Sequence, residues 1–152
     1  MTFHIERAGP EHVETITEHR RAMFSDMGHR DTAALDEMSA AFRPWVAERL
    51  RSGEYLAWVA VAEGSIAAGA GLWLMDWPPH LIGRGSRRGN ILNVYTRPEY
   101  RRLGMARALV ETAVGWCRAN RIGCVILHAS ADGRALYESL GFRATNEMRL
   151  LT

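Results

Sequence analysis

The stretch RPEYRRLGMARAL, two-thirds of the way along the chain, places arginines and small residues where a strand gives way to a helix. The first N–H groups of any helix lack intrahelical partners, and the helix dipole adds partial positive charge there. Gly104 and Ala106 would let a ligand approach this backbone, and Arg101, Arg102 and Arg107 would add positive charge. Together these features predict a binding site for a phosphate-bearing anion.

Two common phosphate-binding motifs do not account for this stretch. A mononucleotide P-loop requires Gly-x-x-x-x-Gly-Lys-Ser/Thr, which the chain lacks. The loop GRGSRRG at residues 83–89 has some likeness to a dinucleotide-binding loop, but its spacing is wrong and no helix is expected after it. The phosphate-binding turn is therefore expected at the later stretch.

Hydrophobic periodicity and turn residues predict the elements that position this turn. Strands are expected at residues 3–8, 54–62, 66–76, 90–96, 124–129 and 143–151. Helices are expected at residues 10–24, at one or two places between 25 and 50, and at 104–118 and 133–140. The resulting order, β-α-α-β-β-β-α-β-α-β, predicts an α/β (α+β) fold. We expect a single domain over residues 1–152, with a mixed, mostly antiparallel central sheet flanked by helices.

Composition limits the class of protein. A net charge of +2 is too small to indicate a nucleic-acid partner by itself. The apolar residues 55–75 contain Glu63 and Gly64, good turn residues, so a hairpin is expected there in place of a membrane span. The N-terminus lacks the apolar core of a signal peptide. Cys117 and Cys124 have no metal-binding spacing and are expected to be reduced core residues, which favours a cytoplasmic protein.

Two segments resemble the GCN5-related N-acetyltransferase (GNAT) family. VYTRPEYRRLGMARAL resembles the family's pyrophosphate-binding motif, Arg/Gln-x-x-Gly-x-Gly/Ala, with Arg101, Gly104 and Ala106 in register. Downstream, ASADGRALYESLGF is similar to the family's Asn-x-x-Ala-x-x-Leu-Tyr-x-x-x-Gly-Phe segment. The resemblance extends over the whole chain. It implies transfer of acetyl from acetyl-CoA to a primary amine of a small molecule or peptide, by direct attack on the thioester and without a metal.

The resemblance also implies roles for individual residues. The strand at 91–96 would splay from its parallel neighbour and free backbone groups for pantetheine, with the Val94 N–H on the thioester carbonyl. Tyr137 has the family's position for the acid that protonates the leaving thiolate. The catalytic residues expected are Tyr137, Val94 and Asn93. The cofactor-binding residues expected are Val94, Tyr95, Thr96, Arg101, Arg102, Leu103, Gly104, Met105, Ala106, Arg107, Ser130, Gly133, Arg134 and Tyr137.

The sequence departs from the family pattern at three positions. Ser130 stands where Asn is frequent, and Gly133 stands where Ala is common. Asn93 occupies a strand in which many members have a carboxylate as general base, and an amide cannot take a proton. The base is therefore left open; the candidates are His80, Asp76, Glu37 and a chain of water molecules.

The acceptor is also left open. Acidic residues in the segment expected on the substrate side would suit a cationic amine; they are Asp26, Asp31, Asp36 and Glu37. The arginines of the 83–89 loop are expected to be solvated. As alternatives, they would hold a substrate carboxylate, the 3′-phosphate of CoA or RNA; they are Arg84, Arg87 and Arg88. His12 and His19 are expected to be solvated, and His128 to be a core residue.

Two rival functions follow from the same residues. A non-catalytic acyl-CoA-binding regulatory or interaction module is favoured by the missing strand carboxylate, while the retained Tyr137 argues against it. An RNA-binding domain is disfavoured because the chain has no basic stripe with interleaved aromatic residues. The resemblance is compatible with a homodimer, but no residue locates an interface. The membrane is not an expected partner.

Overall fold

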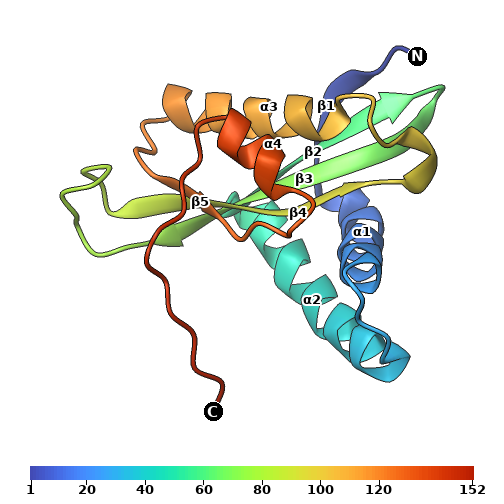
Figure 1. Cartoon of the computed structure of the whole chain (residues 1–152), viewed down its shortest axis with the longest axis horizontal. Coiled ribbons are helices and arrows are strands. Elements are labelled where there is room, and N and C mark those ends of the chain that lie inside the picture. Colours follow the sequence, from blue (N-terminus) through green and yellow to red (C-terminus); the bar gives the residue numbers. More distant parts are fainter.

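The computed structural model describes residues 1–152 and consists of a five-stranded sheet with helices on both faces (Figure 1). The strands are β1 (His4–Ala8), β2 (Tyr55–Ala62), β3 (Ser65–Asp76), β4 (Arg87–Thr96) and β5 (Val125–Leu127). The α-helices are α1 (Val13–Asp26), α2 (Thr32–Ser52), α3 (Met105–Ala119) and α4 (Arg134–Ser139). Short 3-10 turns, Pro10–His12 and Pro98–Tyr100, precede α1 and the turn before α3.

The strands lie in the order β1-β2-β3-β4-β5. The first three pairings are antiparallel, and β4 pairs with β5 in parallel. The parallel ladder is short, because it joins Gly89 to Val125 and ends where Ile91 meets Leu127. This confirms the expected mixed, mostly antiparallel sheet, and it leaves the last five residues of β4 without a neighbour on the β5 side.

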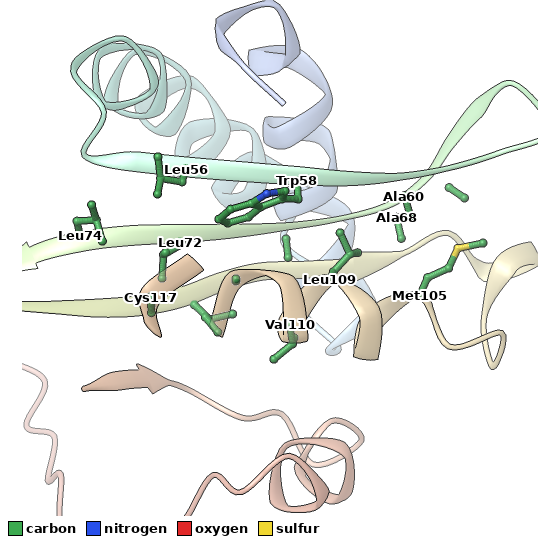
Figure 2. Packing of buried hydrophobic residues seen from close by; sticks show 14 of the residues in the cluster. Leu56, Trp58, Ala60, Ala68, Leu72, Leu74, Met105, Leu109, Val110 and Cys117 are labelled. Atoms are coloured by element: carbon green, nitrogen blue, oxygen red, sulfur yellow. The ribbon is translucent and has the colours of Figure 1, made fainter. Parts of the chain in front are cut away.

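The larger core lies between the sheet and α3 (Figure 2). Apolar residues recur every three or four positions on α3, and Met105, Leu109 and Cys117 are buried against side chains of β2 and β3 such as Trp58 and Leu72. Residues three and four apart share one face of a helix, so this spacing buries a continuous stripe. α3 is thereby fixed along the sheet, with its N-terminus beside the end of β4.

A second core lies on the opposite face, beneath α1 and α2. Phe42 and Val46 of α2 pack there against Tyr55 of β2. Two glycines of β3 keep this face open, because a Cβ at Gly71 would lie 1.9 Å from the Tyr55 hydroxyl and a Cβ at Gly69 would lie 3.0 Å from Nδ1 of His19. Polar side chains from β2 and α1 can therefore cross the sheet surface towards β4.

A β-bulge interrupts β4 next to these glycines. Gly71 pairs with Leu92 and Gly69 with Tyr95, so two residues of β4, Asn93 and Val94, oppose one residue of β3. Asn93 has a positive φ of 55°, a conformation that Asn tolerates better than most residues. A bulge leaves its extra residue outside the ladder and turns the strand, so β4 departs from β5 at this point.

One predicted strand is wrong. Residues 143–151 form no strand, and their apolar side chains are exposed, Met148 at 95% and Leu150 at 85%. The segment extends away from the sheet in Figure 1. Two boundaries also differ: β4 begins at Arg87 inside the expected loop, and β5 is three residues long. Gly141 closes α4, since this residue has a φ of 95° and the Phe142 N–H bonds the Tyr137 carbonyl.

None of the helices combines the length and the apolar character needed to cross a membrane.

Candidate active site

A cleft of about 1580 Å³ opens where β4 departs from β5. One half is lined by the second part of β4, the turn before α3, the first residues of α3, and the segment from β5 into α4. The other half is lined by α1, α2 and Trp73 of β3. The two halves meet at the bulge, which contributes both Asn93 and Val94.

The turn before α3 presents backbone donors to the first half of the cleft. Arg102 and Gly104 both have positive φ, 65° and 86°. The first hydrogen bond of α3 runs from the Ala108 N–H to the Gly104 carbonyl at 3.1 Å, and no side chain caps the helix. The preceding N–H groups, including those of Met105 and Ala106, thus lack an intrahelical acceptor. This arrangement can bind an anion.

The arginines around the turn have different surroundings. Arg101 donates from Nε to the Thr96 carbonyl at 3.0 Å and forms an ion pair with Asp26 at the end of α1. Arg107 donates to Ser139 Oγ at 2.8 Å. Arg102 is exposed at the cleft and has no ion-pair partner. Arg102 is therefore the cation of this turn whose charge is free for a ligand.

Tyr137 reaches the same half of the cleft from α4. Its ring packs edge-on against Phe142 with centroids 6.0 Å apart, and burial raises the pKa of the phenol above its ordinary value. A Cβ at Gly133 would lie 2.8 Å from Cε2 of Tyr137, which gives a physical reason for glycine where the family commonly has alanine. Ser130 Oγ accepts the Gly133 N–H at 3.2 Å and so fixes the start of α4.

Asn93 is part of a polar network beneath the bulge. Its Oδ1 accepts from Nη1 of Arg20 at 2.8 Å, and its Nδ2 donates to the Tyr55 hydroxyl at 2.8 Å. Asn93 is buried, with 4% of its surface exposed, although an atom of the residue reaches the cleft. Burial raises the pKa of Tyr55 to about 12, so the phenol stays neutral. The network holds the bulge in place and contains no group that takes a proton near neutral pH.

His128 and Glu147 form an exposed pair at the mouth of the cleft. Nε2 of His128 lies 3.1 Å from both carboxylate oxygens of Glu147, and His128 lines the cleft at the end of β5. The expectation of a core histidine is therefore wrong, because β5 ends at Leu127 and the next residue lies beyond the sheet. The expectation of a solvated His19 is also wrong, since it is 6% exposed between α1 and β3.

The cleft gathers most of the residues singled out from the sequence. It is lined by Asn93, Val94, Tyr95, Thr96, Arg101, Arg102, Gly104, Met105, Ala106, Arg107, Ser130, Gly133 and Tyr137. Leu103 and Arg134 lie outside it; Leu103 is exposed and Arg134 pairs with Glu138 on the outer surface of α4. The segment from β5 into α4 thus contributes through Ser130, Gly133 and Tyr137.

The residues considered for the base and for the acceptor lie elsewhere. Asp76, His80 and Glu37 do not line the cleft, and neither do the arginines of the 83–89 loop. Asp36 pairs with Arg21, and Asp31 caps the N-terminus of α2 by accepting from the Ala34 N–H. Of the four acidic residues, only Asp26 reaches the cleft, where Arg101 neutralises it.

Sequence reasoning missed Arg20. This side chain lines the second half of the cleft. In the sequence, Arg20 is one of three charged residues close together on α1, with Glu18 and Arg21, and nothing in their residue types sets it apart. Helical spacing from the buried Ile16 places Arg20 four residues on, on the inner face. That spacing is the one signal in the sequence that separates Arg20 from Arg21.

Comparison with known proteins agrees with this geometry. Residues 13–142 match the model of the acetyltransferase (GNAT) family. The crystal structure of a GCN5-related N-acetyltransferase from Ralstonia eutropha JMP134 superposes with a TM-score of 0.94, at 34% identity over 99% of each chain. A predicted acetyltransferase from Clostridium acetobutylicum, solved with acetyl-CoA, has a TM-score of 0.88 at 24% identity, over 99% of this chain and 96% of its own.

A curated relative gives a more distant match. Human N-acetyltransferase 8 is 30% identical over 93 residues, which is 59% of this chain and 39% of the human protein. The chain thus spans about two fifths of that relative. The family match and the fold, together with the anion-binding turn before α3, define the class of protein. The chain belongs to the GNAT acetyltransferase family.

Proposed function

We propose that residues 1–152 act as one N-acetyltransferase domain that moves acetyl from acetyl-CoA to a primary amine. The observation that carries the proposal is the turn before α3, where unpartnered N–H groups, two left-handed residues and the free Arg102 face the cleft. Pyrophosphate is the kind of anion that such a helix N-terminus binds. The acetyl-CoA named in the description of the Clostridium structure supports the same cofactor.

When bound, acetyl-CoA supplies a thioester whose C–S bond breaks as the amine nitrogen forms a C–N bond to the carbonyl carbon. The bulge at Asn93 and Val94 is the part of β4 nearest both halves of the cleft, so we assign the Val94 N–H to the carbonyl oxygen. A donor aimed at a developing oxyanion is worth about 3–4 kcal/mol. Asn93 holds the bulge through Arg20 and Tyr55.

We assign Tyr137 as the acid that protonates the departing thiolate. Its raised pKa keeps the phenol protonated over the physiological range, so it can donate its O–H to sulfur. A group of this kind typically contributes about 10²–10⁴ in rate. Ser130 and Gly133 position the helix that carries it.

We assign His128 as the base that accepts the proton of the amine. His128 lines the cleft just beyond the end of β5, and Glu147 orients its Nε2. A histidine with a carboxylate on one nitrogen presents the other nitrogen as the acceptor. A proton would thus leave the amine through Nδ1 of His128.

The first test is the melting temperature with and without acetyl-CoA. Ligand at 100 times its dissociation constant adds about 2.7 kcal/mol of stability, which is a rise of roughly 5–10 °C for a chain of this length. Release of CoA thiol in the presence of amines then reports transfer. A rise in melting temperature without thiol release for any amine would favour the non-catalytic acyl-CoA-binding module. No rise at millimolar acetyl-CoA would overturn the proposal.

A further inference from the structure

The half of the cleft opposite the turn before α3 is largely apolar. Beyond the cofactor segments, its wall is made by large apolar side chains of α1, α2 and β3, with two charged groups among them: Arg20, and Asp26, which pairs with Arg101. The apolar side chains include Met23, Phe24, Met38, Phe42, Trp45 and Trp73. Such a wall favours a bulky apolar group on the ligand, because burying that group removes apolar surface from water.

Arg20 is held rigidly within this wall. Its guanidinium carbon lies 5.0 Å from the ring centroid of Phe24 and 4.8 Å from that of Phe42, so two aromatic faces restrain it. Nη1 donates to Asn93, while Nε is buried without any hydrogen-bond partner. An arginine has five N–H donors in a fixed fork that matches a carboxylate. The contacts to Asn93 and the rings leave donors of this fork unused.

The charge of Arg20 has no counter-ion. Arg20 takes part in no ion pair, and the other charges that line the cleft do not compensate it: Asp26 is paired with Arg101, and Asp132 lies in the segment before α4. A partly buried cation is stabilised when an anion pairs with it. Burial lowers the pKa of Arg20, but a guanidinium remains protonated in proteins.

The position of Arg20 limits where the anion of a ligand can lie relative to the amine. Arg20 bonds Asn93, and the next residue, Val94, carries the N–H assigned to the thioester carbonyl. A carboxylate on Arg20 therefore lies close to the reacting carbon. An amine on the carbon next to that carboxylate can reach the thioester, whereas a cationic amine alone meets the uncompensated positive charge.

We propose that the acceptor is a free α-amino acid with a large apolar side chain, whose carboxylate binds Arg20 and whose side chain binds the Met, Phe and Trp wall. This inference rests on the proposed acetyl transfer and adds its substrate class. Arg20 is the specificity-determining residue. The acidic residues and the 83–89 arginines, considered from the sequence, take no part in acceptor binding.

The test compares amino acids with the matching amines that lack the carboxylate. Thiol release is measured with L-phenylalanine, L-phenylalanine amide and phenethylamine, and in parallel with L-leucine and isoamylamine. We expect kcat/KM at least tenfold higher for each amino acid than for its carboxylate-free counterpart, mainly through KM. Equal values for L-phenylalanine and its amide would overturn the acceptor class, as would a peptide with an N-terminal phenylalanine acting better than the free amino acid.

Two variants test whether Arg20 is the residue that causes the preference for a carboxylate. Arg20→Met should abolish the preference for the carboxylate, while Arg21→Met, the neighbouring arginine that pairs with Asp36 outside the cleft, should retain it. A retained preference in a folded Arg20→Met protein would overturn the assignment. The wild-type comparison does not depend on how either variant folds. Two outcomes separate the proposals. Thermal stabilisation by acetyl-CoA together with thiol release from amines other than amino acids overturns the acceptor class alone. No stabilisation, or stabilisation with no thiol release from any amine, overturns acetyl transfer itself.

Discussion

Asn93 donates a hydrogen bond to the hydroxyl of Tyr55 at 2.8 Å, although 38 residues separate them in the chain. The contact is possible because Gly71, between them on β3, has no side chain to block the phenol. The bulge of β4 is thus held by a residue of β2, which lies on the other side of β3.

Replacing Tyr55 by Phe should therefore cost stability. The change leaves the buried Nδ2 of Asn93 without its acceptor, and an unsatisfied buried donor costs about 1–3 kcal/mol. Urea unfolding measures the loss. Tyr100→Phe is the matched control, because its hydroxyl makes no hydrogen bond within the protein, and its stability should stay within about 0.5 kcal/mol of wild type. Equal stability of both variants would contradict the network.

Gly104→Ala should weaken acetyl-CoA binding and stability together. Gly104 has a φ of 86°, and a side chain in this conformation costs roughly 1–2 kcal/mol. Gly115→Ala lies within the same helix, with a negative φ and open space around it, so it should raise stability by up to about 1 kcal/mol and leave binding unchanged. The acetyl-CoA-dependent shift in melting temperature distinguishes the two variants. An unaltered shift in Gly104→Ala would argue against the turn as the pyrophosphate site.

Tyr137→Phe should lower kcat at least tenfold while acetyl-CoA still stabilises the protein. The phenol ring and its packing on Phe142 are retained, and only the proton donor is lost. Because burial raises the pKa of Tyr137, any alkaline decline in wild-type activity from this group should begin at a higher pH than for an unburied tyrosine. Steady-state rates between pH 6 and 10 check both statements. Unchanged kcat would remove the acid role.

His128→Gln should lower kcat/KM, because it removes the nitrogen assigned to accept the amine proton. Glu147→Gln should lower kcat/KM to a smaller extent, because it removes the carboxylate that contacts Nε2 of His128. His4→Gln is the control: His4 forms a similar pair with Glu6 on β1, outside the cleft. A wild-type kcat/KM in His128→Gln would exclude the base role.

His19 should make the protein sensitive to acid. Burial, with a smaller contribution from the charge of Arg97, lowers the pKa of His19 to about 4 from 6.5. The unfolded chain therefore binds a proton that the folded chain does not, and stability falls as the pH drops from about 6.5 to 4. The full effect is about 3 kcal/mol. Urea unfolding at pH 7 and pH 5 should give a smaller difference for His19→Gln than for wild type; an identical difference would show that His19 does not titrate in this way.

Much of the fold could be predicted from local signals. The α3 stripe of Met105, Leu109 and Cys117 and the Glu63-Gly64 turn follow from periodicity and turn chemistry, and both are present. The strand expected at residues 143–151 illustrates the limit of such signals, because alternating apolar residues become a strand only where a partner edge accepts them. Here the apolar side chains of that segment remain in solvent.

Some residues of the candidate site could likewise be predicted from local signals, and others could not. Arg102 and Gly104 could be predicted because the anion-binding turn is contiguous in sequence. Arg20 and His128 could not, because their access to the cleft depends on the bulge in β4 and on the short length of β5. Neither feature has a local sequence signature. Long-range pairing therefore decides which charged residue becomes a ligand-binding group and which remains on the surface.

The pairing of Glu147 with His128 bears on how the protein should be handled. Glu147 lies five residues before Thr152, in an extended segment with no strand partner, yet it contacts a side chain at the mouth of the cleft. A purification handle fused to that end is attached to the segment that carries Glu147, so it can alter the contact with His128 and the rates being measured. The opposite end begins beside β1, the sheet edge farthest from β5, so a handle placed before Met1 leaves the cleft undisturbed (Figure 1).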